Sequence, residues 1–303
     1  MELGMIGLGK MGGFMVERLV RGGHRIIGLD RDPAAVARVV EKGATGAESI
    51  DKLIGQLKAP RAIWIMVPSG KPVDDTIDRL LPHLSPGDTI IDGGNSYYRD
   101  SVRRGAALAP KKINFVDCGT SGGVWGLTEG YSMMVGGDAE VVKRLAPIFQ
   151  TLAPGPEKGW GRVGPTGAGH YVKMVHNGIE YAIMQAYAEG LDLFRHKTEF
   201  GLDLLQITKI WQYGSVVRSW LLDLTVDALS KNPTLDGIEA FVTDSGEGRW
   251  TAMEGIEHGV PLPALTGALD ARFRSQDPQP FANKLLAMMR HEFGGHAVKT
   301  ATK

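Results

Sequence analysis

A glycine-rich turn near the start of the chain restricts its fold more than any other feature. Residues 7–12 read Gly-Leu-Gly-Lys-Met-Gly and fit the pattern G-x-G-x-x-G. An apolar run, Leu3–Leu8, predicts a buried strand before the pattern, and residues 10–21 predict a helix after it. In this context the first glycine permits the tight turn, the second lets a pyrophosphate approach the backbone, and the third lets helix and strand pack closely.

The turn therefore predicts a dinucleotide-binding site, where phosphates meet free N–H groups and the positive end of a helix dipole. A glycine turn without a ligand is the alternative. The residues that we expect to contact the cofactor here are Gly7, Leu8, Gly9, Lys10, Met11 and Gly12.

Short apolar runs alternate with helical patterns through the first half of the chain. The runs that predict further strands are Arg25–Leu29, Ala62–Val67, Thr89–Asp92, Asn114–Asp117 and Ser132–Gly136. This alternation predicts an α/β Rossmann-type N-terminal domain with a parallel-sheet core, covered by helices on both faces.

A Gly/Pro-rich stretch at residues 154–165 suits a domain junction. Beyond it the pattern is helical, and one long helix is expected from Ala168 to about Phe194. Further helices are expected within 202–229, within 250–258 and from Phe281 onward. We therefore expect a dinucleotide-binding domain over residues 1–165 and an all-α C-terminal domain over residues 166–303.

Charge and cysteine content limit the partners and the compartment. Lys+Arg and Asp+Glu both number 34, a balance that argues against a broad nucleic-acid or anionic-membrane surface. The single cysteine, Cys118, excludes an internal disulfide and is expected to be a small buried residue in a reducing compartment. We see no signal peptide, bilayer-spanning run or metal-ligand spacing among the eight histidines, so we expect a cytoplasmic protein without a metal.

The choice of cofactor is expected to depend on the end of the second strand. Asp30 stands where an acidic residue accepts hydrogen bonds from the adenosine ribose hydroxyls. A 2′-phosphate there would face a carboxylate, and two unit charges ~4 Å apart at an effective dielectric of ~20 repel by about 4 kcal/mol. Arg31 follows and is either a partner for such a phosphate or a solvated surface side chain. We expect NAD, with NADP or dual use as the alternative.

A polar face on the long helix carries the candidate chemistry. Lys173, His176, Asn177 and Glu180 stand at i, i+3, i+4 and i+7 and therefore share one side of a helix. A neighbouring apolar stripe is expected to anchor the helix in the core; it consists of Val172, Val175, Ile179 and Ile183. A solvated surface with a charge pair is the alternative, although asparagine has poor propensity for a helix interior.

Hydride removal from a secondary alcohol needs a base for the hydroxyl proton. A lysine that is partly shielded from water can have its pKa lowered to roughly 7–8 and can serve as that base. A carboxyl group one or two turns away can hold a second proton and act as an acid. Lys173 and Glu180 together would thus supply one base and one acid without a metal.

Four motifs occur in the order of a known family. They are Gly7–Gly12, Asp92-Gly93-Gly94-Asn95-Ser96, Ser121-Gly122-Gly123 and the helix segment His170–Tyr181. Together they resemble 6-phosphogluconate dehydrogenases, within the wider β-hydroxyacid dehydrogenase superfamily, and the resemblance extends from residue 1 to about residue 296. It implies oxidative decarboxylation of 6-phosphogluconate to ribulose 5-phosphate and CO2 with reduction of NAD, a step of the pentose phosphate pathway.

The resemblance also implies residue roles. Lys173 would take the C3 hydroxyl proton and later protonate the carbonyl oxygen as CO2 leaves, and Glu180 would protonate C1 of the resulting enol. Val67, Pro68 and Ser69 would pass under the cofactor ribose, and Asn95 would lie between cofactor and substrate. The remaining substrate contacts would come from Ser121, Gly122, Gly123, His176, Asn177, Tyr181 and Arg272, the last two at the phosphate.

The C-terminal segment matches the part of this family that reaches the partner subunit's site. Arg290 and His296 would bind substrate there, which implies a homodimer or homotetramer. A frayed terminus is the alternative. The chain is too short for the large helical domain of long family members and resembles the compact form. Ser245 and Glu247 replace lysine and threonine phosphate ligands of the long forms, and Glu247 would repel a phosphate.

Two other functions stay open at this point. A non-decarboxylating β-hydroxyacid dehydrogenase, acting on a substrate like 3-hydroxyisobutyrate, would keep Lys173 but would need neither Glu180 nor a phosphate site. A cofactor-binding regulatory protein would need no intact catalytic face.

Overall fold

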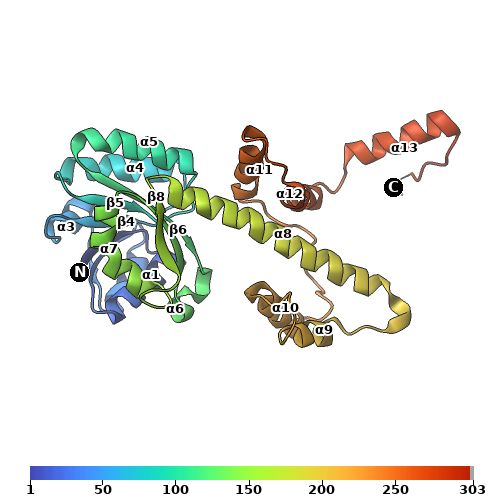
Figure 1. The fold of residues 1–303 in the computed structure, drawn as a ribbon, viewed down its shortest axis with the longest axis horizontal. Helices are drawn as coiled ribbons and strands as arrows, with labels where there is room; N and C mark the ends of the chain where they lie inside the picture. The colour runs from blue at the N-terminus through green and yellow to red at the C-terminus, as the bar shows by residue number, and fades with distance from the viewer. Residues whose placement is uncertain (301–303) are drawn as a thin grey trace. The chain divides into compact units, whose positions relative to one another are not determined.

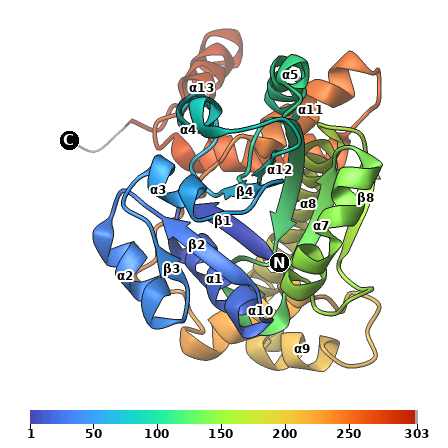
Figure 2. The ribbon, with the colours of Figure 1, turned by 90° about the vertical axis from the view of Figure 1, so that its left-hand side faces the viewer.

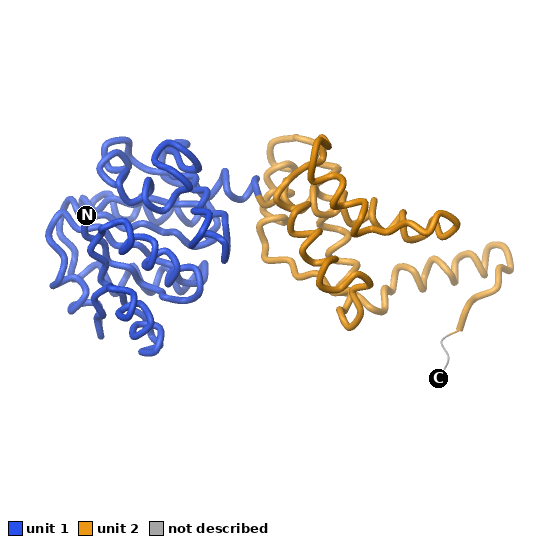
Figure 3. The backbone as a smooth tube through the Cα atoms, turned by 90° about the horizontal axis from the view of Figure 1, so that it is seen from below, with its two compact units in different colours: residues 1–176 blue, residues 177–303 orange. Residues whose placement is uncertain are grey.

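A computed structural model describes residues 1–300, which fall into two compact units. The first covers Met1–His176 and the second begins at Asn177 (Figure 3). Helix α8 (Ala168–His196) starts in the first unit and continues into the second. Among the described residues, no helix is both long and apolar enough to cross a bilayer.

The first unit is built on an eight-stranded sheet with the order β3-β2-β1-β4-β5-β6-β7-β8 (Figures 1 and 2). All neighbouring strands are parallel except β6 and β7, which are antiparallel. The strands are β1 (Glu2–Ile6), β2 (Arg25–Leu29), β3 (Thr45–Gly46), β4 (Ala62–Ile65), β5 (Thr89–Asp92), β6 (Asn114–Ser121), β7 (Ser132–Gly136) and β8 (Trp160–Gly164). The predicted Rossmann-type fold is confirmed, with one antiparallel pair that the sequence analysis did not anticipate.

Seven α-helices and three 3₁₀ helices connect these strands. They are α1 (Lys10–Arg21), α2 (Pro33–Glu41), α3 (Ile50–Gly55), α4 (Lys71–Leu80), η1 (Leu81–His83), α5 (Tyr98–Leu108), η2 (Ala109–Lys111), η3 (Gly123–Trp125), α6 (Gly126–Glu129) and α7 (Ala139–Leu152). The strand order reverses between β1 and β4, and ligands of open α/β sheets bind beyond the carboxyl ends of the strands at such a point.

Two apolar cores lie on opposite faces of the sheet. In β1, Leu3 and Met5 belong to a cluster with α1, α2 and α7, whereas Ile6 belongs to a cluster with α3, α4 and α5. Successive strand side chains point to opposite faces, so a continuously apolar strand feeds both cores. β4 and β5 are buried along their whole length, as this arrangement requires.

Several element ends differ from the sequence prediction for local reasons. β1 stops at Ile6 rather than at Leu8 because Gly7 adopts a positive φ of 96°. β4 ends at Ile65, whereas β6 runs four residues further than expected, to Ser121. β8 lies inside the Gly/Pro-rich stretch interpreted as a junction, and neither β3 nor α3 was predicted.

Every regular element described after residue 177 is helical. The continuation of α8 is followed by η4 (Thr198–Phe200), α9 (Leu204–Trp211), α10 (Trp220–Lys231), α11 (Glu247–Glu257), α12 (Pro263–Gln276) and α13 (Phe281–Gly294). The predicted segment 202–229 is two helices rather than one, since Gly214 has a φ of 73° and Ser219 caps the start of α10 by accepting from the Leu222 N–H. Helix α12 was not predicted.

The expected apolar anchor of α8 is wrong. Val172, Ile179 and Ile183 are exposed, Ile179 to 50%, whereas Lys173 is only 7% exposed and Asn177 is also buried. Lys173 and Asn177 of the polar face, rather than the apolar stripe, are therefore shielded from water in the single chain.

Candidate active site

The glycine turn after β1 has a separate steric reason for each glycine. A Cβ at Gly7 would lie 2.7 Å from the carbonyl carbon of Met66, and one at Gly12 would collide with the carbonyl group of Gly7. A Cβ at Gly9 would meet no atom within 4 Å. Gly7 and Gly12 thus allow close packing inside the protein, and Gly9 borders open space, where the sequence analysis expects the pyrophosphate.

Asp30 braces this turn, a role that the sequence analysis missed. Its carboxylate accepts hydrogen bonds from the Leu8 N–H at 2.5 Å and from the Asp32 N–H at 2.9 Å. A carboxylate has about four acceptor positions, so two remain for ribose hydroxyls. Arg31 is exposed beside it, and its predicted role remains untested.

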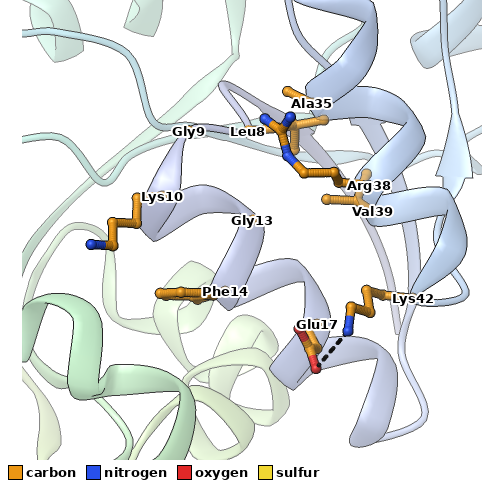
Figure 4. A pocket seen from close by; sticks show the side chains of 10 residues that line it. All are labelled: Leu8, Gly9, Lys10, Gly13, Phe14, Glu17, Ala35, Arg38, Val39 and Lys42. Atoms are coloured by element: carbon orange, nitrogen blue, oxygen red, sulfur yellow. Dashed lines mark ion pairs between the residues drawn. The ribbon is translucent and has the colours of Figure 1, made fainter.

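A cavity of about 370 Å³ lies between α1 and α2 next to the turn (Figure 4). Lys10 borders it from α1, Arg38 borders it from α2, and Lys42 borders it from the residue that follows α2. Carboxylates already engage two of these cations: Lys42 pairs with Glu17 at 3.6 Å, and Arg38 pairs with Asp32 at 3.7 Å.

The loop after β4 carries the other residues that are predicted to contact the cofactor. Val67 is half-buried, whereas Pro68 and Ser69 are exposed. The loop ends at Gly70, which has a φ of 81° and precedes α4. These residues follow the strand next to β1, at the point where the strand order reverses.

The motif Asp92–Ser96 begins at the last residue of β5 and forms a loop that hydrogen bonds hold in place. The Asp92 carboxylate is fully buried and accepts from the Gly94 N–H at 3.1 Å and the Ser96 hydroxyl at 2.8 Å. A Cβ at Gly93 would collide with the Trp64 ring, at 2.6 Å from Cε2 and closer still to Nε1. Asn95 lies between Gly94 and Ser96, which both donate to Asp92, and is itself exposed.

Lys173 lies one turn after Gly169, where α8 packs tightly on the sheet: a Cβ at Gly169 would be 2.5 Å from the carbonyl oxygens of Asp117 and Met134. A Cβ at Gly119 of β6 would lie 2.8 Å from the carbonyl oxygen of Gly169 and closer still to the Cβ of Lys173, so only glycine fits there. The Lys173 ammonium lies 3.5 Å from Nδ1 of His176. The close approach of the Gly119 backbone to the Lys173 side chain therefore determines where this catalytic candidate lies.

The start of α8 is fixed to the sheet by Asp117 of β6. Its carboxylate accepts from the Gly167 N–H at 2.6 Å and from the His170 N–H at 2.8 Å. Nδ1 of His170 is 2.7 Å from the Ser101 hydroxyl of α5, and all of these side chains are buried. Neither Asp117 nor Gly119 can be recognised from the sequence as part of the site, because their partners lie about 50 residues away.

Ser121, Gly122 and Gly123 follow at the end of β6. Gly122 has a φ of 128° and Gly123 a φ of 52°, which side-chain-bearing residues rarely adopt. The glycines of this motif thus have a conformational reason, and their contacts with substrate remain a prediction.

In the second unit, Tyr181 and Arg272 come together. The Arg272 guanidinium lies 3.6 Å from the centre of the Tyr181 ring and donates to the Thr243 carbonyl oxygen at 2.8 Å. The Tyr181 hydroxyl is 3.1 Å from the Ser245 hydroxyl, which donates to Glu247 at 2.6 Å. Glu247 is buried, so its carboxylate is directed toward these hydroxyl groups rather than toward water.

Arg290 and His296 are exposed, and no residue of α13 is buried. Nδ1 of His291 lies 2.9 Å from the His296 carbonyl oxygen. Within one chain, these two substrate candidates therefore belong to no buried cluster, and their role in a partner's site stays a prediction.

The comparison with known proteins covers both units. Residues 2–163 match the profile of the NAD binding domain of 6-phosphogluconate dehydrogenase, and residues 169–301 match the C-terminal domain of the same enzyme. The chain belongs to the 6-phosphogluconate dehydrogenase family.

Relatives agree with the compact form. The NAD(+)-dependent, decarboxylating 6-phosphogluconate dehydrogenase of Haloferax volcanii is 42% identical over 299 residues, which are 98% of each chain. The solved 6-phosphogluconate dehydrogenase of Plasmodium falciparum has a TM-score of 0.84 and 29% identity, and the match covers all of this chain but 67% of that one. The 3-hydroxyisobutyrate dehydrogenase of Mycobacterium tuberculosis, at 22% identity and a TM-score of 0.72 over 91% of this chain and 94% of that one, shares the fold.

Proposed function

We propose that this chain catalyses the NAD-dependent oxidative decarboxylation of 6-phosphogluconate to ribulose 5-phosphate and CO2, a step of the pentose phosphate pathway in the cytoplasm. The observation that carries the proposal is α8, which holds Lys173 against Gly119, shielded from water, and bears Glu180 seven positions later. Seven residues are about two helical turns, so both side chains project from one side of the helix. Membership of the family and the NAD dependence of the Haloferax volcanii relative support the same reaction.

The residues of the first unit fit a nicotinamide dinucleotide. The turn Gly7–Gly12 would hold the pyrophosphate, because Gly9 borders open space at the start of α1. Asp30 would accept from the adenosine ribose, and the loop Val67–Ser69 would lie against the nicotinamide ribose. A cofactor held by these residues would supply the hydride acceptor for the oxidation at C3 of the substrate.

The protein's own groups then move the protons. Lys173 takes the C3 hydroxyl proton as the alcohol is oxidised, which gives a 3-keto acid. Loss of CO2 sends the electron pair of the broken C–C bond to the carbonyl oxygen, and Lys173 returns its proton there to give an enol. Glu180 donates a proton to C1 of the enol while Lys173, which is neutral at this stage, takes the enol hydroxyl proton, and the ketone ribulose 5-phosphate results.

The remaining polar residues would orient the substrate. Asn95, which is exposed between pinned neighbours, would lie between cofactor and substrate. Ser121, Gly122, Gly123, His176 and Asn177 would bind the sugar-acid end. Tyr181 and Arg272 would bind the phosphate, and their direct contact supports this pairing.

We propose that the active form is a homodimer or homotetramer, in which Arg290 and His296 reach the partner's site. Apolar side chains are exposed on α13, with Phe293 at 95%, and on the stripe formed by Val172, Ile179 and Ile183. Contiguous exposed apolar surface is typical of interaction sites, which supports the proposal. Residues 1–165 would form the dinucleotide-binding domain, and residues 166–303 the substrate and dimerisation domain.

The test is the initial rate with 6-phosphogluconate labelled at C1, with NAD+ or NADP+, and with CO2 trapped. We expect NADH and labelled CO2 in equal amounts and a higher kcat/KM with NAD+. Turnover of 3-hydroxyisobutyrate without CO2 release, and none of 6-phosphogluconate, would replace this assignment by the non-decarboxylating alternative.

A further inference from the structure

Arg104 is a buried cation that the proposed reaction does not use. It lies on α5, and only 2% of its side chain is exposed. Arginine is rarely buried unless its charge is paired and its donors are satisfied, because removal from water is costly. Its partners therefore indicate what it holds in place.

From α5, the guanidinium binds two other segments of the chain, the start of α4 and the end of β5. Nε donates to Asp74 of α4 at 2.8 Å, and one terminal nitrogen donates to Asp92, the last residue of β5, at 3.3 Å. The other terminal nitrogen donates to the carbonyl oxygen of Gly70 at 3.0 Å. The planar fork of arginine fixes all three directions at once, which a lysine ammonium cannot do.

Two of these partners control the loops beyond β4 and β5. Asp92 holds Gly94 and Ser96 on either side of Asn95, and Gly70 closes the loop Val67–Ser69. β4 and β5 are neighbouring parallel strands, so both loops leave the same edge of the sheet. They also lie against each other, since a Cβ at Gly94 would be 3.1 Å from the Val67 carbonyl oxygen.

We propose that Arg104 is a positioning residue that locks the loop Val67–Ser69 and the loop Asp92–Ser96 into one rigid unit, and thereby sets where Asn95 stands relative to the nicotinamide ribose. The proposal rests on the roles given above to Asn95 and to Val67–Ser69. Burial raises the pKa of Asp74, but hydrogen bonds from Arg104 and Arg103 outweigh it and lower that pKa, which agrees with a paired carboxylate.

The neighbouring Arg103 provides a matched control. It donates to the same Asp74 at 3.0 Å and to Asp100 at 3.2 Å, but 55% of its side chain is exposed and it contacts neither loop. Both Arg103→Lys and Arg104→Lys keep the positive charge and remove the planar guanidinium. The first does so at an exposed position and the second at a buried one. Arg104→Lys is preferred to Arg104→Ala, because alanine would leave the buried carboxylate of Asp92 without its cation.

The experiment compares these two variants and Asn95→Ala at a temperature at which thermal melting shows each to be folded. For Arg104→Lys we expect the NADH dissociation constant to rise and kcat to fall, on the order of 10- to 100-fold for an ångström-scale displacement of positioning groups. For Arg103→Lys we expect the NADH dissociation constant and kcat to stay within about twofold of wild type, because an exposed ion pair contributes little. Arg104→Lys combined with Asn95→Ala should lower kcat by less than the product of the single effects, because both act through one loop.

A purely structural role predicts a different pattern. A folded Arg104→Lys variant with wild-type NADH affinity and kcat, or effects that multiply fully with those of Asn95→Ala, would overturn the proposal. If wild-type protein failed to turn over 6-phosphogluconate, the proposed function would be refuted, and the NADH dissociation constants would still decide the role of Arg104.

Discussion

The close approach of β6 to α8 makes Gly119→Ala a sharp test of how Lys173 is placed. The new Cβ would lie 2.8 Å from the Gly169 carbonyl oxygen and closer still to the Lys173 Cβ, well inside the 3.4 Å at which ordinary contact begins. Strand and helix would have to separate by about 1 Å, because closely packed backbone cannot turn aside. Overpacking of this kind costs about 1–3 kcal/mol of stability.

The catalytic effect should exceed the stability effect. Displacing a reacting group by about 1 Å can cost on the order of 100-fold in rate, so we expect kcat with 6-phosphogluconate to fall 10- to 100-fold in protein that is still folded. Gly161→Ala is the control: it lies in β8 of the same sheet, and its Cβ would meet no atom within 4 Å. We expect this variant to keep its kcat within about twofold, since an unopposed surface change has little effect.

The assay is steady-state NADH formation at saturating substrate, with thermal melting followed in parallel. A Gly119→Ala protein with wild-type kcat and melting temperature would show that the contact with β6 does not position Lys173.

Three further outcomes follow from single residues. Lys173→Met should abolish turnover, while fluorescence titration still shows NADH binding; near-normal activity would refute its role as the base. Asp30→Ala should narrow the preference for NAD+ over NADP+ in kcat/KM, and an unchanged ratio would show that this carboxylate does not select the cofactor. Burial raises the pKa of the Cys118 thiol to about 12, so the thiol stays protonated at pH 8 and should resist iodoacetamide until urea unfolds the protein. Rapid alkylation of the folded protein at pH 8 would contradict this burial.

Much of the fold could be predicted from local pattern. α1, β2, β5 and β7 begin and end where their apolar runs and flanking glycines place them. β8 was missed because Trp160–Gly164 is Gly-rich, short and partly exposed, and therefore lacks the apolar run of a buried strand. α12 was missed because its apolar residues are spread around the helix instead of forming one face.

The sequence also proposes which residues make up the candidate site, but it does not show which buried residues hold them in place. The spacing of Lys173 and Glu180 reveals a shared helix face, yet which face is shielded depends on what packs there. The apolar stripe was therefore assigned to the wrong side. Asp117 and Arg104 act through partners that are distant in sequence, and no local spacing marks them.

The central claim is that Lys173 and Glu180 act at different steps, the first at hydride transfer and the second at protonation of the enol. The most direct test is the primary deuterium isotope effect on kcat with 6-phosphogluconate deuterated at C3, measured for wild type and for Glu180→Gln. We predict that Glu180→Gln lowers kcat and that the isotope effect shrinks toward one, because protonation of C1 becomes the slow step. A lowered kcat with a large, undiminished isotope effect would place Glu180 in the hydride-transfer step and contradict the division of roles.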